Sequence, residues 1–298
     1  MGLAPKAKFF RTPHEYVFEM HLAKQVLEGK VDLTAEEIEQ LVGTLSDQYR
    51  RFPNVVETPR RDVYYVGDLH GELQSALAAQ QLVQNRRDAT MVFLGDYADR
   101  GPQQIETVNL VFSIAIEYPY RVMALRGNHE SDSIARTYGF YNAVTAKYSP
   151  DVFDIYCSGF KVLPLGGLSS NGVFSCHGGI PEGVDTLEQI QKVDRFHEDF
   201  QDPIALQLTW NDPAEGDFRF SPNWRGGGSM TYGRLAFNEF AESLGIVLMF
   251  RAHQVFPDGV QTFFDEKLIS VFSATYNNRV KPKIVHLGNG LKTEVIPI

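Results

Sequence analysis

The stretch that decides the fold is VYYVGDLH, residues 63–70, in which a short apolar run ends abruptly on side chains that can bind a metal. The same arrangement recurs in MVFLGDYADR (91–100), VMALRGNHE (122–130), VFSCHGG (173–179) and IVLMFRAH (246–253). Continuous apolar runs of this length are typical of strands that are covered on both faces. Helical stretches lie between several of them, so the sequence predicts an α/β fold.

Potential ligands follow each of these runs, and buried strands can bring such ends together at one rim of a sheet. The set comprises Asp68, His70, Asp96, Asn128, His177 and His253. Taken singly, an Asp or Asn is an ordinary turn residue and a His is commonly structural. Because five strand ends carry the same type of group, we interpret them as one site.

The donor types of this set constrain the metal. Nitrogen and oxygen ligands without a thiolate suit manganese, iron or zinc better than calcium. Six ligands exceed the needs of one tetrahedral site and a carboxylate can bridge, so we expect two ions about 3.5–4 Å apart. Such a pair lowers the pKa of a shared water to roughly 7 and favours in-line displacement at phosphorus.

Neighbouring residues fit the remaining tasks of phosphoester hydrolysis. Arg100 and Arg225 are candidate guanidinium forks for phosphate. Read alone, however, Arg225 is equally consistent with a surface arginine in a glycine-rich loop. His129 could protonate a leaving alkoxide if Asp99 orients its ring.

Composition excludes several classes of protein. The chain has 298 residues and a formal net charge of −9, from 28 Lys+Arg and 37 Asp+Glu. Its 43% hydrophobic and 22% charged content exclude a disordered or fibrous chain. The acidic balance disfavours nucleic acid as a partner. Two cysteines are too few for a disulfide framework and indicate a reducing compartment.

No apolar run is long enough to cross a membrane, and the first residues lack the apolar core of a secretory signal. We therefore expect a cytoplasmic protein that has neither a membrane nor a nucleic-acid partner.

Residues 1–60 are expected to be helical. Thr34 and Glu37 have the spacing of a capping box. The apolar residues that follow at helical spacing, and that should dock on the main body, are Ile38, Leu41, Val42 and Leu45. No linker follows, so we predict one domain over residues 1–298, with a helical part (1–60) and a core (61–298).

The blocks GDLHG (67–71), GDYADRG (95–101) and GNHE (127–130) resemble the three signature blocks of the PPP-type serine/threonine protein phosphatases. Later blocks also match: YGFY (138–141), HGG (177–179), RAHQ (251–254) and FSA (272–274). The resemblance covers most of the chain from about residue 30 onward. It implies a calcineurin-like metallophosphoesterase fold, which is a central β-sandwich flanked by helices.

The resemblance also implies the role of each site residue. Asp68, His70 and Asp96 would hold the first metal. Asp96 would bridge to a second metal, which Asn128, His177 and His253 complete. His129, paired with Asp99, would be the proton donor, and Arg100 and Arg225 would bind the phosphoryl oxygens.

Two positions depart from the family pattern. After Ala274 the chain reads Thr275-Tyr276-Asn277-Asn278, so the tyrosine comes one residue earlier than in the usual Pro-Asn-Tyr-Cys run, and the cysteine is missing. Tyr276 is thus the counterpart of the family's substrate-side tyrosine in an altered loop. Glu72 stands where Gln is common. The chain ends at Ile298, soon after the last expected strand, so we expect a catalytic core without a regulatory tail.

The leading hypothesis is hydrolysis of phosphoserine and phosphothreonine in proteins by a hydroxide that two metal ions activate. Manganese is expected to support it in vitro, with iron or zinc as further candidates. Phosphoproteins would be the substrates, and no motif for a regulatory subunit is readable. Two alternatives stay open: a dinucleoside polyphosphate hydrolase of the same superfamily, and a catalytically inactive binding module.

Overall fold

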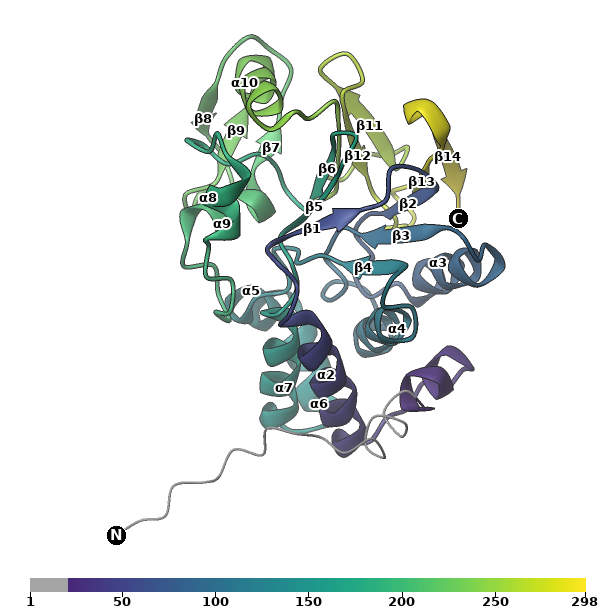
Figure 1. The fold of residues 1–298 in the computed structure, drawn as a ribbon. Helices are drawn as coiled ribbons and strands as arrows, with labels where there is room; N and C mark the ends of the chain where they lie inside the picture. The colour runs from purple at the N-terminus through teal and green to yellow at the C-terminus, as the bar shows by residue number, and fades with distance from the viewer. Residues whose placement is uncertain (1–20) are drawn as a thin grey trace.

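The computed structural model describes residues 21–298 and contains two central β-sheets that pack face to face (Figure 1). The five-stranded sheet has the order β14 (Thr293–Pro297), β13 (Lys283–Leu287), β2 (Val63–Val66), β3 (Thr90–Phe93) and β4 (Val122–Ala124). The strands β2, β3 and β4 run parallel, whereas β13 pairs antiparallel with both β2 and β14. The predicted sandwich is confirmed.

The six-stranded sheet has the order β1 (Val55–Thr58), β5 (Gly166–Ser169), β6 (Val173–Cys176), β10 (Leu248–Arg251), β12 (Leu268–Val271) and β11 (Val260–Phe263). Its central strands β6, β10 and β12 are parallel. A small third sheet has the order β7 (Asp212–Pro213), β9 (Met230–Tyr232) and β8 (Phe220–Pro222).

Apolar side chains fill the space between the two large sheets. Tyr65 from β2 and Phe250 from β10 stack with ring centroids 3.7 Å apart. The strands that precede the predicted ligands are buried along their whole length, except for Met123 in β4. Burial on both faces explains why their sequences are continuous apolar runs rather than alternating ones.

Helices cover the outer faces of the sandwich (Figure 1). Those that pack outside the five-stranded sheet include α2 (Ala35–Tyr49), α3 (Leu73–Asn85), α4 (Gln104–Glu117), α6 (Phe140–Lys147) and α7 (Pro150–Phe160). On the other side lie α8 (Leu187–Gln191), α9 (Pro203–Trp210) and α10 (Arg234–Leu244). Further helical segments are α5 (Asp132–Tyr138) and the 3-10 turn η1 (Asn289–Leu291).

The capping box at the start of α2 is confirmed, since Glu37 N donates to Thr34 Oγ1 (3.2 Å) and Thr34 N donates to Glu37 Oε2 (3.0 Å). The four apolar residues predicted to dock from this helix are buried against α4 and α7.

The prediction of a helical part over residues 1–60 is wrong at its end, because residues 55–58 form β1, which pairs in parallel with β5. Residues 21–27 are helical. The predictions for residues 1–20, including the missing secretory signal, lie outside the described residues. One strand is shorter than expected: Ile246 and Val247 precede β10, and Val247 is half exposed. None of the helices in residues 21–298 combines the length and apolar character that crossing a bilayer requires.

Candidate metal centre and phosphate site

The six predicted ligands come together at one end of the sandwich, on loops that follow β2, β3, β4, β6 and β10. His70 Nε2 lies 3.6 Å from Asp68 Oδ2 and 3.7 Å from Asp96 Oδ2. On the other side of Asp96, His177 Nε2 lies 3.3 Å from Oδ1. Ligands therefore reach this end from both sheets.

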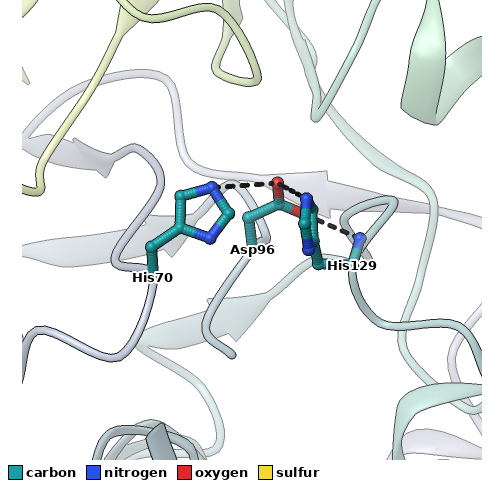
Figure 2. A group of neighbouring side chains, drawn as sticks. All are labelled: His70, Asp96 and His129. Atoms are coloured by element: carbon teal, nitrogen blue, oxygen red, sulfur yellow. Dashed lines mark hydrogen bonds and ion pairs between the residues drawn. The ribbon is translucent and has the colours of Figure 1, made fainter. Parts of the chain in front are cut away.

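Asp96 lies at the centre of the group. Ligand atoms of His70, Asp96 and His129 are all within 4.8 Å of one another, and so are those of Asp96, His177 and His253. Figure 2 shows the His70 and His129 rings on either side of the Asp96 carboxylate. One carboxylate thus belongs to two sets of buried donors.

Backbone carbonyls orient two of the imidazoles. His70 Nδ1 lies 3.0 Å from Ala98 O, and His177 Nδ1 lies 2.9 Å from Leu94 O. In each ring this leaves Nε2 directed at Asp96. A hydrogen bond at one ring nitrogen that presents the other nitrogen is the usual arrangement at metal-binding histidines.

Asn128 completes the group beside His177, with its Oδ1 2.9 Å from His177 Nε2. Asp68 accepts a hydrogen bond from the backbone N–H of His253 at Oδ1 (2.8 Å), which ties the loop after β2 to the loop after β10.

The electrostatics of the group suit cations. The buried atoms Asp68 Oδ2 and His253 Nε2 have no hydrogen-bond partner among the described residues. Burial and the neighbouring Asp96 carboxylate raise the pKa of Asp68 to about 6. Burial lowers the pKa of His70 to about 3 and that of His253 well below its usual range, so both rings are neutral. Neutral imidazoles with uncompensated carboxylates are what a metal ion requires.

Several of these residues have a left-handed backbone. The φ angles are +43° at His70, +58° at Asp96, +67° at Asp99, +69° at Arg100 and +66° at His253. Strain of this kind concentrates at functional sites, where the surrounding structure holds it in place. Gly127 packs directly against the Asp96 carboxylate, because a Cβ there would lie 2.3 Å from Asp96 Oδ1.

Sequence reasoning did not assign a role to Glu130, which is fully buried beneath the centre. Its carboxylate accepts hydrogen bonds from the backbone N–H groups of Asp96 (2.7 Å), Tyr97 (2.9 Å) and Gly127 (2.9 Å). It therefore joins the loops that carry Asp96 and Asn128. The available signal was its place in the GNHE block, next to His129.

His129 and Asp99 form the predicted pair, with His129 Nδ1 2.6 Å from Asp99 Oδ2. Asp99 Oδ1 also accepts a hydrogen bond from Phe140 N (2.8 Å), which fixes the carboxylate. Burial opposes the charged form of His129, but the Asp96 charge and the Asp99 hydrogen bond outweigh it and raise the pKa of His129. Its Nε2 faces the centre, 3.9 Å from Asp96 Oδ2.

A cleft of about 460 Å³ opens over these ligands. The three predicted phosphate-binding residues Arg100, Arg225 and Tyr276 line it together with His70, Asp96, Asn128, His129 and His253. The Arg100 guanidinium lies over two rings, 4.7 Å from the Tyr138 centroid and 5.7 Å from the Tyr276 centroid.

A second residue that sequence reasoning missed, Asp212, holds Arg225 at the cleft. Arg225 Nε donates to Asp212 Oδ2 (2.7 Å), and the buried Arg251 donates to Oδ1 (3.0 Å). Asn223 Nδ2 donates to the same carboxylate (2.9 Å). Asp212 follows helix α9 rather than a buried strand, so the pattern that revealed the ligands did not include it.

Comparisons with known proteins agree with this geometry. The family model "Calcineurin-like phosphoesterase" matches residues 62–257. The Candida albicans protein "Serine/threonine-protein phosphatase PP2A-like PPG1" is 38% identical over 246 residues, which are 81% of this chain and 58% of that protein. The chain thus spans little more than half the length of this curated relative.

Among solved structures, a protein serine/threonine phosphatase from Saccharomyces cerevisiae with similarity to human phosphatase PP5 superposes with a TM-score of 0.81 at 27% identity, over 96% of each chain. A cold-active protein-tyrosine phosphatase from a psychrophilic Shewanella shares the fold, with a TM-score of 0.60 at 18% identity over 83% of this chain and 84% of that one. The family match and the buried His and Asp groups indicate a metal-binding protein. The chain belongs to the calcineurin-like phosphoesterase family, and within it the resemblance to the serine/threonine protein phosphatases is confirmed.

Proposed function

We propose that the chain hydrolyses phosphoserine and phosphothreonine in proteins. The observation that carries the proposal is the cleft in which Asp96 lies between His70 on one side and His177 and His253 on the other, while two arginines line the walls. The names of the similar phosphatases favour this substrate class over a dinucleoside polyphosphate.

The donor set supports two ions rather than one. Asp96 presents Oδ2 to His70 and Oδ1 to His177, so its two oxygens face different ligand sets. In the proposed assignment, Asp68, His70 and Asp96 hold one ion, and Asp96, Asn128, His177 and His253 hold the other. Nitrogen and oxygen donors favour manganese, iron or zinc. Bound ions of this kind supply a water of lowered pKa and offset charge on the phosphoryl oxygens.

The chain's own residues would bind the substrate and deliver a proton. Arg100 and Arg225 donate to the phosphoryl oxygens, as guanidinium groups do at phosphate sites, and Tyr276 lies beside them. Asp99 keeps the proton of His129 Nδ1 in place, which directs Nε2 into the cleft. The Asp96 charge and the Asp99 hydrogen bond raise the pKa of His129, which favours the protonated ring whose Nε2–H would protonate the leaving seryl or threonyl oxygen.

The proposed substrates are phosphoproteins, and the proposed compartment is the cytoplasm. Both cysteines, Cys157 and Cys176, are buried thiols and are not joined in a disulfide, which suits a reducing compartment.

The test uses the full chain loaded with Mn²⁺, with a phosphothreonine peptide and diadenosine tetraphosphate as competing substrates. We expect turnover of the peptide and a loss of about 10²–10⁴ in kcat for His129→Asn. The matched control is His286→Asn, since His286 lies near Asp62 (Nε2–Oδ1 3.5 Å) in β13, away from the cleft. An unchanged rate in His129→Asn would contradict the proton donor. Turnover of the dinucleotide alone would replace the proposed function, and no turnover with no bound metal would favour a binding module.

A further inference from the structure

A second cavity of about 420 Å³ adjoins the catalytic cleft. His70, Arg100 and Tyr276 line both, so a peptide bound in the cleft can extend into it. Its far wall is the loop of residues 274–279, which is the segment that departs from the family pattern. We call this hollow the Arg279 cavity.

Glu72 fastens that loop in place. Both of its carboxylate oxygens accept hydrogen bonds from Thr275, one from the backbone N–H and one from Oγ1. The next three residues, Tyr276, Asn277 and Asn278, have positive φ angles of 49°, 59° and 61°. The backbone N–H of Arg279 then donates back to Thr275 O (2.9 Å), which closes the turn. The position of Arg279 is therefore defined by the loop.

Two arginines and one glutamate supply the charged side chains at this cavity. Within residues 21–298, the side chains of Arg279 and Arg100 form no ion pair and no hydrogen bond. The only carboxylate among the lining residues is Glu72, and Thr275 occupies both of its oxygens. By contrast, the nearby Lys281 pairs with Asp258 (2.9 Å).

We propose that the Arg279 cavity is a subsite for an anionic side chain that flanks the phosphoresidue. The shared chemistry is a carboxylate or a second phosphate, both of which a guanidinium binds through paired N–H groups. The amides of Asn277 and Asn278 supply further donors at the same wall. The inference rests on the proposed function, since it names the substrates that the same cleft prefers.

The experiment measures kcat/KM for phosphothreonine peptides that differ at one flanking position, scanned on both sides of the phosphoresidue. The arms carry alanine, lysine, glutamate or phosphoserine at that position. At one flank, we expect glutamate or phosphoserine to raise kcat/KM about two- to fivefold over alanine, mainly through KM, and lysine to lower it. High salt should abolish the difference, because the groups are exposed.

Two variants test whether the preference for an anionic flank comes from Arg279 or from the overall charge of the surface. Arg279→Gln should abolish the preference and Arg279→Glu should invert it, while turnover of the alanine peptide stays unchanged in both. The control Lys281→Gln removes a nearby exposed cation that does not line the cavity, and it should keep the preference.

The outcomes are distinguishable. Equal kcat/KM for all peptides, or a preference that survives in Arg279→Gln, would overturn the subsite and leave the proposed function intact. A preference for phosphoserine alone would identify the anion as phosphate, and equal gains would show that either anion is accepted. If the wild-type chain hydrolysed none of the peptides, the proposed function would fail and the subsite with it.

Discussion

Replacing Glu130 by Gln should destabilise the protein and loosen the metal centre. The carboxylate accepts three backbone N–H bonds, two at Oε2 and one at Oε1. A glutamine oxygen placed at Oε2 keeps the bonds from Asp96 and Gly127, but its NH₂ group then faces the Tyr97 N–H. One buried donor becomes unsatisfied at about 1–3 kcal/mol, and two bonds lose charge assistance at roughly 1 kcal/mol each.

We therefore expect a loss of about 3–5 kcal/mol in the free energy of unfolding, a large share of the roughly 5–15 kcal/mol of an ordinary domain. The assay is urea unfolding followed by circular dichroism, with EDTA present so that metal binding does not contribute. In a separate titration, affinity for Mn²⁺ should fall about 10–100-fold, as for other groups that support metal ligands.

The control is Glu239→Gln, which makes the same chemical change at an exposed carboxylate that pairs with Arg219 (2.6 Å). Its cost should be at most about 1 kcal/mol. The reasoning is refuted if Glu130→Gln unfolds at the same urea concentration as Glu239→Gln and binds Mn²⁺ like the wild type.

Three further predictions follow from other contacts. Asp212→Asn should raise KM for the phosphopeptide about tenfold by releasing Arg225, and it should be non-additive with Arg225→Ala in a double-mutant cycle; full additivity would contradict the contact. Tyr65→Phe should leave urea stability unchanged or raise it by up to about 1 kcal/mol, because the Tyr65 hydroxyl is buried without a partner among the described residues. Tyr49→Phe should lower stability by about 1 kcal/mol, because the Tyr49 hydroxyl accepts a hydrogen bond from Ala124 N (3.1 Å). Equal changes in urea stability for Tyr49→Phe and Tyr65→Phe would refute this difference between the two hydroxyls. Burial raises the pKa of the Cys176 thiol to about 12, so only roughly 10⁻⁵ of it is thiolate at neutral pH. Iodoacetamide should therefore label Cys176 only after the protein unfolds, and the labelling rate should rise with pH. Mass spectrometry measures the labelled fraction.

The sandwich was predictable because its strands carry their own signal. Residues 63–66 and 173–176 form strands with the bounds that their apolar runs indicate. Residues 55–58 fall within the predicted helical part but form a strand, whose partner β5 is far along the chain. Pairing with a distant strand leaves no local pattern.

The contrast between local sequence signals and contacts with distant segments also explains which site residues could be predicted. Each predicted ligand follows a buried strand, so its position is encoded locally, and the structure brings all six together. The roles of Asp212 and Glu130 come from contacts with residues distant in sequence. Asp212 reaches Arg251, and Glu130 reaches the backbone of Asp96, so neither role is visible until the chain is folded. The family resemblance identified the signature sequence blocks but not the contacts that Asp212 and Glu130 make.

The positive φ angles around the centre affect how the site should be probed. Of His70, Asp96, Asp99, Arg100 and His253, all but Arg100 are Asp or His, which, with Asn, are the non-glycine types that enter the left-handed region most readily. An alanine scan would therefore confound two losses, that of the functional atom and that of a residue suited to the backbone. Asparagine at the same positions removes the charge or the basic nitrogen, and it still adopts the left-handed backbone readily. Such variants are the better candidates for inactive copies that retain the wild-type shape, with which binding of the proposed phosphoprotein substrates can be tested.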